Sequence, residues 1–378
     1  ADWNKLRHPE GDPFTEPGFI GAVEKSMARD GKFWHVIFRD AGGQPVASAS
    51  FCTYKVDATL LAEEGVVKRI AGAIRRIAPW AVKLKVLFCG LPVSAGQSNL
   101  RFAPGVDRAA ITRQLDRLLR KTAVRAFAHC IIYKEFPEAD GAALGLEALG
   151  YMRADSLPMN HTDPQFKDFD DFLAHLKSSK RYTIRKQQKK FDKSGMRVVQ
   201  MLGGEGADQV CTDDVHRLYL NVLDKAKVKL EQLPAEFFRE LARQLPQQSA
   251  YTFVYQGDRV VAFACSIFSD DVFHQMFVGV DYELNAQWDL YFNLFYKAID
   301  YAFRRQVRDI IVGQSADMFK QQRLNCFQVP LYFYIRGSNF ISQLVIRTGF
   351  SALFPPHPLL APEKEEGETQ ETIPPPAG

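Results

Sequence analysis

Apolar positions follow a regular order of strand-like and helix-like periods in the first part of the chain. Two β-rich runs flank the turn Asp40-Ala41-Gly42-Gly43, which is a hairpin signal. Asp107 is placed to cap a segment with a 3.6-residue apolar period. The predicted elements are a strand pair within 33–56, a basic helix at 66–80, a strand at 84–90, a loop at 92–105, a helix at 107–125, a strand at 128–136 and a short helix at 143–151 that ends at Gly150.

The second part of the chain repeats this order. Residues 249–268 are typical of two strands around a Gly-Asp turn, and 271–280 of a third strand. A strong helical pattern at 288–305 leads to strands at 307–313 and 330–336. The shared order of hairpin, strand, loop, helix and strand indicates a duplication of pattern, although the halves are not a sequence repeat. Strands that alternate with helices favour an α/β mixed sheet in each half.

A basic segment separates the two halves. KSSKRYTIRKQQKK (177–190) contains seven Lys or Arg and no acid. Such a run is typical of a solvated helix face, a nucleic-acid patch or a docking site for phosphate. We expect a helix from 176 to about 193, capped by Ser178 or Ser179, that wraps one lobe and faces the other. Its position between the lobes favours an anion-docking helix beside a cleft.

The chain changes character after residue 336. NFISQLVIRTGFSALF (339–354) places its apolar residues on one helical face, and 355–378 is rich in Pro and Glu, which favours disorder. The predicted division is an N-terminal lobe at 1–165, a basic helical linker at 166–198, a C-terminal lobe at 199–338, an amphipathic helix at 339–354 and an acidic tail at 355–378.

Composition and charge narrow the class of protein. With 378 residues and 46% apolar content, the chain can bury a sizeable core. The net charge is +4, and residues 363–378 hold five Glu and one Lys, so residues 1–362 carry about +8. A moderately basic body suits an anionic ligand or surface.

The cysteines, the apolar runs and the first residues together indicate the cellular compartment of the protein. The six cysteines lie far apart without a CxxC pair, which argues against a metal site or a disulfide framework and for a reducing compartment. No apolar run approaches the roughly 20 residues of a membrane helix, and the first residues have no signal-peptide pattern. We expect a cytoplasmic protein, with peripheral contact to the inner face of the membrane through 339–354 as a further hypothesis.

Two segments resemble a known family. They are DFDDFLAHLKSSKRYTIRKQQKKFDKSGMRV (168–198) and LYFNLFYKAIDYAFRRQVRDIIVGQSADMFKQQRLNC (290–326), the latter preceded by HQMFVGVDYE (274–283). Together they resemble the tandem GNAT-type acyltransferases related to the FemABX peptidoglycan aminoacyltransferases, and the order of elements agrees over most of 15–336. The resemblance implies an α/β fold of two GNAT-like mixed-sheet lobes with a ligand cleft between them.

The chain departs from the family pattern in two places. The family often carries an acid at the position of Ile311, whereas this chain has Asp309 two residues earlier on the same side of the strand. DYELNAQWDLYFN (281–293) contains no Gly for a pyrophosphate loop. The first turn of the helix at 288–305 and the loop at 92–105 are the alternative cradles, because free backbone N–H groups bind phosphate.

Candidate catalytic residues follow from the resemblance together with the chemistry of N-acyl transfer. An amine must be deprotonated, an oxyanion stabilised and a leaving thiolate protonated. His274 is the expected general base, since imidazole titrates near neutrality. Gln314 would bind a carbonyl, Lys320 a phosphate or oxyanion, and Asp317 would pair with Lys320 or orient the amine. The structural alternatives are a core histidine, a loop amide and a solvated lysine.

Further candidates lie on the helix at 288–305 and in the basic segment. The resemblance implies that Tyr291 protonates the leaving thiolate, while packing among neighbouring Phe residues is the structural alternative. Asn293, Lys180, Arg181 and Arg185 are expected to bind the anionic donor, and a solvated helix face is the alternative for the three cations.

These features predict an N-acyltransferase that moves an acyl group from acyl-CoA or an acyl carrier protein thioester to a primary amine. The 29 Phe and 13 Tyr, together with 339–354, favour a lipidic acceptor such as a sphingoid base, by analogy with GNAT-like bacterial ceramide synthases. One alternative is aminoacyl-tRNA-dependent transfer to a peptidoglycan precursor, the enzymatic alternative in which tRNA is a partner. The other is a non-catalytic binding module on a GNAT scaffold.

Overall fold

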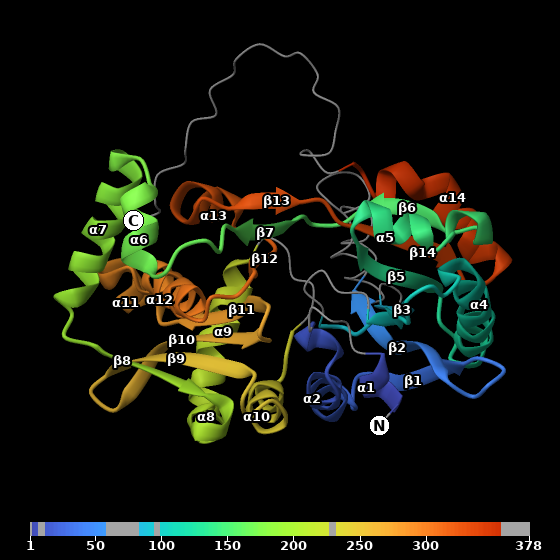
Figure 1. Ribbon diagram of the computed structural model, residues 1–378, viewed down its shortest axis with the longest axis horizontal. Helices are drawn as coiled ribbons and strands as arrows, with labels where there is room; N and C mark the ends of the chain where they lie inside the picture. The colour runs from blue at the N-terminus through green and yellow to red at the C-terminus, as the bar shows by residue number, and fades with distance from the viewer. Residues whose placement is uncertain (1, 7–11, 58–82, 94–98, 227–231, 357–378) are drawn as a thin grey trace, which may run out of the picture.

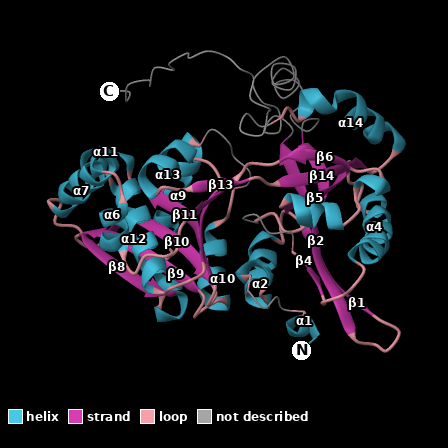
Figure 2. Cartoon of the chain, turned by 45° about the horizontal axis from the view of Figure 1, so that its top comes forward, coloured by secondary structure: helices cyan, strands magenta, loops and turns pink. Residues whose placement is uncertain are grey.

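The chain forms two β-sheets that lie side by side, each flanked by helices (Figures 1 and 2). The computed structural model describes residues 2–6, 12–57, 83–93, 99–226 and 232–356. The helix predicted at 66–80, residues 94–98 of the predicted loop and residues 357–378 of the predicted tail lie outside the described residues.

The first sheet has the strand order β1-β2-β3-β5-β14-β6, with β4 paired to β2. Its strands are β1 (Lys32–Arg39), β2 (Pro45–Asp57), β3 (Lys83–Cys89), β4 (Leu100–Phe102), β5 (Cys130–Phe136), β6 (Met152–Asp155) and β14 (Tyr332–Gly337). The second sheet has the order β13-β7-β12-β11-β10-β9-β8. Its strands are β7 (Met159–Thr162), β8 (Arg197–Leu202), β9 (Ser249–Gln256), β10 (Arg259–Phe268), β11 (Val272–Val280), β12 (Asp309–Gly313) and β13 (Phe327–Val329).

The two sheets share one building pattern. Each contains an antiparallel hairpin, β1–β2 or β9–β10, followed by a parallel pair, β3–β5 or β11–β12. A parallel pair needs a crossover, and here a helix supplies it: α4 (Arg108–Arg125) in the first lobe and α12 (Leu290–Arg304) in the second. The predicted duplication and the α/β mixed-sheet fold are confirmed.

The other helices cover the faces and ends of the sheets. They are α1 (Asp2–Lys5), η1 (Pro13–Thr15), α2 (Pro17–Met27), α5 (Glu138–Ala143), η3 (Glu147–Leu149), α6 (Phe169–His175), α7 (Ser178–Asp192), η4 (Gly203–Glu205), α8 (Ala207–Val210), α9 (Asp213–Lys225), α10 (Ala235–Gln244), α11 (Tyr282–Trp288), α13 (Asp317–Leu324) and α14 (Phe340–Leu353). Within the described residues, no helix combines the length and the apolar character needed to cross a bilayer.

Helix ends test the predicted caps. The Asp107 carboxylate accepts a hydrogen bond from the Ala110 N–H at 2.9 Å, so the predicted N-cap of α4 is confirmed. The cap predicted for α7 is wrong, because the helix begins at Ser178 and Lys177 occupies the N-cap position without a side-chain hydrogen bond. The predicted end at Gly150 is confirmed, since Gly150 has φ 87° directly after η3.

The predicted boundaries of the lobes need a correction, because each sheet includes a strand from the other part of the chain. β7 lies within the predicted N-terminal lobe but pairs with β12 and β13 of the second sheet. β14 lies within the predicted C-terminal lobe but pairs with β5 and β6 of the first sheet. Each of these strands is paired on both sides, and such pairing depends on which backbone groups meet in space, which local pattern does not encode. The two lobes are therefore interlocked.

The N-terminal segment strengthens this interlock. Phe14 is fully buried, and its ring packs at 4.7 Å from the ring of His274 in the second sheet. The helix α2 packs on α10, where the Lys25 ammonium lies 2.8 Å from the buried Glu240 carboxylate. Residues near the N-terminus thus complete the core of the second lobe.

We expect Phe14→Ala to lower the free energy of unfolding by about 3–5 kcal/mol, because it leaves a cavity where the two lobes meet. Urea denaturation followed by fluorescence would measure this change. Phe127→Ala is the matched control, since Phe127 is 85% exposed and should cost less than about 0.5 kcal/mol. Equal effects of the two substitutions would contradict the interlock.

Candidate functional site

A gap opens between β11 and β12 at the centre of the second sheet. The parallel ladder pairs Val272 with Asp309, Phe273 with Ile310 and His274 with Ile311. Beyond these pairs the strands separate, and a pocket of about 210 Å³ lies where they diverge. Its lining comprises Val93, Leu157, Tyr219, Val222, Leu223, Ala226, Gln275, Met276, Phe277, Val278, Tyr291, Phe295, Val312, Gly313, Gln314, Ser315, Ala316 and Lys320. The wall is mostly apolar, with a few polar groups from the end of β12.

The loop after β12 has an unusual backbone. Gly313, Ser315 and Ala316 all have positive φ, at 82°, 62° and 53°. Left-handed backbone is costly for residues with a Cβ, so other contacts must hold it. The Lys320 ammonium provides them, because its Nζ donates to the Gly313 and Gln314 carbonyls at 2.9 Å each.

Lys320 is a buried cation that lines the pocket. Burial lowers the pKa of Lys320 from 10.5 to about 8, while the neighbouring Cys326 and Asp317 act in the opposite direction. An ammonium has three N–H donors, and two of them bind the loop carbonyls. The third N–H is the donor that a negative charge in the pocket can use.

Tyr291 also lines the pocket, at the start of α12. Its ring packs against Phe295 and Phe319, with centroid distances of 5.1 and 5.7 Å. Burial raises the pKa of Tyr291 to about 12, so the phenol stays protonated near neutral pH. The Tyr291 backbone N–H already binds the Asn285 side-chain oxygen at 2.7 Å, which removes one donor from the predicted phosphate cradle at this helix start.

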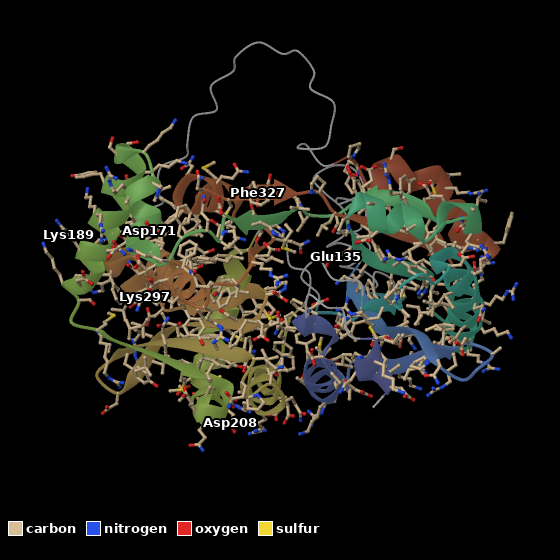
Figure 3. All side chains as sticks on the ribbon, in the orientation of Figure 1. Glu135, Asp171, Lys189, Asp208, Lys297 and Phe327 are labelled. Carbon is tan, nitrogen blue, oxygen red and sulfur yellow. The ribbon has the colours of Figure 1, made fainter. Side chains whose placement is uncertain are left out.

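Gln314 connects the pocket to the first lobe. Its Nε2 donates to the Leu157 carbonyl at 2.8 Å and lies 3.4 Å from the Glu135 carboxylate on β5. Glu135 is buried and has φ 54°, in the left-handed region. Figure 3 shows Glu135 between the two lobes. Sequence reasoning missed this residue, although an acid in the mostly apolar strand AHCIIYKEF was a usable signal.

Comparisons with known proteins agree with this architecture. A family model described as peptidoglycan biosynthesis/recognition matches residues 1–323. The chain belongs to the FemAB-like family. No curated protein matches the sequence of this FemAB-like chain.

Several solved structures share the fold of the FemAB-like chain at low sequence identity. FemX is 11% identical with a TM-score of 0.54, covering 91% of this chain and 96% of FemX. A tandem GNAT protein from the clavulanic acid biosynthesis pathway is 13% identical with a TM-score of 0.50, covering 90% and 94%. L-PGS from Bacillus licheniformis is 12% identical with a TM-score of 0.50, covering 90% and 97%. The resemblance to tandem GNAT proteins is thereby confirmed at the level of fold.

His274 lies outside the lining of the pocket in this FemAB-like protein. The side chain is fully buried against Phe14 and does not line the pocket. Burial lowers the pKa of His274 from 6.5 to about 3, with Asp309 raising it and His161 lowering it further. Both ring nitrogens lack a hydrogen-bond partner among the described residues. An imidazole of such low basicity is a poor proton acceptor, so the structure does not support the predicted role.

Asp317 and Asn293 have structural contacts instead of the predicted ones. The Asp317 carboxylate accepts a hydrogen bond from Asn160 Nδ2 at 2.8 Å, which ties α13 to β7. Asn293 Nδ2 donates to the Asp289 and Gln187 carbonyls at 3.0 and 3.4 Å, which ties α12 to α7. Neither side chain lines the pocket.

The basic helix α7 is not the wall of a cleft between the lobes. It lies on the side of the second lobe that faces away from the first (Figures 1 and 2). Lys180 donates to the Gln321 carbonyl at 3.3 Å, near the end of α13. Arg181 donates to the Ala174 carbonyl at 3.0 Å, near the end of α6.

Two further cations of α7, Lys190 and Arg185, also have partners. Lys190 donates to the Ala286 carbonyl at 3.2 Å, within α11, and Arg185 forms an ion pair of 2.8 Å with Asp170. Because the last carbonyls of a helix lack partners within it and attract positive charge, these contacts explain much of the basic run. The predicted docking of a donor on Lys180, Arg181 and Arg185 is corrected accordingly.

We expect His274→Phe to remove an acid-sensitive contribution to stability. The folded pKa of about 3 lies below the ordinary value of 6.5, so between these pH values the unfolded chain binds the extra proton and stability falls as the pH falls. We compare the free energy of unfolding of the variant with that of the wild type at two pH values. The difference should favour the variant by about 2 kcal/mol more at pH 5 than at pH 7.5.

Urea denaturation at the two pH values measures this change. Asp309 and His161 face His274 and are retained in the variant. The exposed His175→Gln is the control, and it should follow the wild type. An unchanged difference between His274→Phe and wild type at pH 5 and 7.5 would contradict the burial of a neutral imidazole.

Proposed function

We propose that this chain is an N-acyltransferase whose reaction takes place in the pocket between β11 and β12. The observation that carries the proposal is the convergence of Lys320, Tyr291 and Gln314 on one pocket between separating parallel strands. The FemAB-like family and the shared fold support a transferase of the acyl type.

The proposed donor is an acyl thioester of CoA or of an acyl carrier protein. Both carry a phosphopantetheine arm, which is extended and contains two amide groups. Where β11 and β12 diverge, their facing backbone edges suit an extended ligand, because such a ligand can pair with strand N–H and C=O groups as an added strand would. The apolar walls, including Val222, Leu223 and Phe295, suit the acyl chain.

Each step of the transfer has a candidate group. The amine nitrogen attacks the thioester carbonyl, a C–N bond forms and the carbonyl oxygen gains negative charge. The third N–H of Lys320 donates to this oxyanion. Before the attack, Glu135 takes the proton that an ammonium acceptor must lose to become a nucleophile. Its carboxylate lies outside the pocket lining, 3.4 Å from the lining residue Gln314. The C–S bond then breaks, Tyr291 protonates the leaving thiolate, and the Tyr291 oxygen takes up the proton that the new amide nitrogen releases.

The proposed acceptor is a lipidic primary amine such as a sphingoid base. The largely apolar lining supports this choice, because a polar acceptor would leave much of the wall without matching contacts. A structure with the same fold, 10% identical with a TM-score of 0.50, is the C-terminal domain of a putative lysylphosphatidylglycerol synthetase from Agrobacterium fabrum. Its product name denotes a lipid, which is consistent with the proposal at the level of analogy.

Aminoacyl-tRNA-dependent transfer to a peptidoglycan precursor is the second candidate. The family description, peptidoglycan biosynthesis/recognition, favours it. The two candidates differ in their donor, so one experiment separates them. Thermal shift with CoA thioesters of graded chain length should raise the melting temperature if the first is correct, since a ligand that binds only the folded state stabilises it.

Activity assays complete the comparison. Acyl-CoA with a panel of short and long-chain amines should yield amide products that do not depend on RNA. Activity that requires aminoacyl-tRNA and is abolished by ribonuclease would favour the second candidate. Turnover of short soluble amines alone would refute the lipidic acceptor, and a biological activity that survives loss of Lys320 would favour a binding module.

We expect Lys320→Met to lower kcat by a factor of about 10²–10³, the usual effect of removing one oxyanion donor. In the wild type the rate should fall as the pH rises through about 8, because the ammonium loses its charge there. This alkaline limb should be absent from the residual activity of the variant. Lys186→Met, on the exposed face of α7, is the control. It should keep the kcat of the wild type and the same fall in rate above about pH 8.

We expect Glu135→Gln to lower kcat by a factor of about 10²–10⁴ while the KM for the donor changes little, because the substitution removes a proton acceptor and keeps the size of the side chain. A weakly basic acceptor, already neutral at the assay pH, should be impaired much less than an alkylamine. Glu138→Gln, on exposed α5, is the matched control. Equal loss with both acceptors would indicate a structural role for Glu135.

A further inference from the structure

One end of the first lobe exposes an unusual number of large apolar side chains. We call it the end patch, and it comprises Val124, Phe127, Phe340, Ile341, Leu344 and Val345. Phe127, Phe340 and Ile341 are 85%, 81% and 75% exposed. Single exposed apolar residues are ordinary, but a gathering of this kind marks a site of interaction.

The members of the end patch come from two helices that meet at one end of the first sheet. α4 and α14 pack on opposite faces of this sheet, and they lie close together in both views (Figures 1 and 2). Ser338, directly before α14, donates through its N–H to the His129 carbonyl at 3.1 Å and through its hydroxyl to the Ala128 carbonyl. These bonds hold the start of α14 beside the turn that carries Phe127.

α14 has an exposed apolar face besides the apolar face that packs on the first sheet. Ile346 is buried, and Phe350 and Phe354 pack with Phe333 against the sheet. The predicted single apolar face of 339–354 is therefore split. One part stabilises the lobe, while Phe340, Ile341, Leu344 and Val345 point away from it. A helix that is apolar on both sides is typical of a segment with a second apolar neighbour.

The turn at Phe127 ends α4. Its φ is 55°, in the left-handed region, and the Phe127 and Ala128 N–H groups donate to the Val124 and Ala123 carbonyls at 3.1 and 2.9 Å, as in a Schellman cap. The cap explains the backbone conformation and leaves the ring 85% exposed. Phe127 therefore adds an aromatic ring to the end patch from a turn whose backbone is held by hydrogen bonds.

Positive charge surrounds the end patch. Arg113, Arg117, Lys121 and Arg125 follow one another at intervals of four residues along α4, and all four are exposed. Like charges at this spacing destabilise a helix, so the stripe is a cost to folding. Within the described residues, Arg117, Lys121 and Arg125 have no ion pair with a carboxylate. The sequence contains no Asp or Glu between Asp116 and Glu135, nor between Asp317 and Glu363.

We propose that the end patch and the cationic stripe of α4 form a docking surface for an anionic lipid bilayer. Aromatic and aliphatic side chains enter the interface between headgroups and acyl chains, and neighbouring Lys and Arg bind anionic headgroups. A second copy of this chain would place like charges against each other. A nucleic acid would use the cations but would have little to bind with Ile341, Leu344 and Val345.

The proposal does not depend on the proposed reaction, and vesicle flotation tests it. The full chain is mixed with phosphatidylcholine vesicles, with or without phosphatidylglycerol. We expect binding to the anionic vesicles that weakens as salt is added, and little binding to the neutral ones. Phe127→Ser/Phe340→Ser and Lys121→Glu/Arg125→Glu should each reduce binding about tenfold or more.

Matched double variants on the second lobe provide the controls. Tyr182→Ser/Phe327→Ser removes two exposed aromatic rings, and Lys186→Glu/Lys189→Glu reverses two exposed charges of α7. Both should bind vesicles as the wild type does. Circular dichroism and melting temperature establish that all four variants fold.

Several outcomes would overturn the proposal. They are absence of binding to anionic vesicles, equal binding by the end-patch variants and wild type, and equal loss in the control variants. Sedimentation that shows a dimer lost only in the end-patch variants would assign the surface to a second copy of the chain, and loss of RNA binding with intact vesicle binding would assign it to RNA. Turnover of a short soluble amine should be unchanged in these variants, so failure of docking and failure of the proposed reaction are distinguishable.

Discussion

The short parallel ladder between β11 and β12 is the constraint on which the candidate site depends. Three residue pairs hold the strands together, and their separation beyond His274 and Ile311 creates the pocket. The loop that follows β12 would be unfavourable by itself, because its backbone is left-handed at three positions. Lys320 stabilises the loop and the loop carbonyls stabilise the buried ammonium, so each is costly without the other.

The pocket also depends on the way the two lobes are joined. Exchange of β7 and β14 between the sheets, with Phe14 inserted beside His274, fixes the first lobe against the second. That arrangement brings the buried carboxylate of Glu135 within 3.4 Å of the Gln314 amide. A duplicated fold with separate lobes would leave this acid far from Gln314 and from the pocket that Gln314 lines. The interlock is thus the physical reason that one site can draw on both halves of the chain.

Positive charge is used in two different ways in this protein. The cations of α7 are largely engaged with helix carbonyls and with Asp170, because a helix end attracts positive charge. Arg117, Lys121 and Arg125 of the stripe on α4 have no such carboxylate partner among the described residues, and they lie on a helix that also carries exposed apolar side chains. Density of Lys and Arg in the sequence is therefore a poor guide to function. Its surroundings in the fold decide whether a basic run is structural or available to a ligand.

Local pattern determined the elements of this protein and much of their order. The period of apolar positions gave the hairpins and crossover helices, and Asp107 and Gly150 marked helix ends, since caps and turns depend on nearby residues. Gln314 and Lys320 line the pocket, as expected of polar groups that follow the end of a parallel strand, and Tyr291, which the family resemblance indicated, lines it too. Only tertiary structure decided the exchange of β7 and β14, the burial of His274, and the proximity of Glu135 to Gln314. Each of these depends on contacts between residues far apart in the chain, whose geometry and desolvation no local pattern encodes.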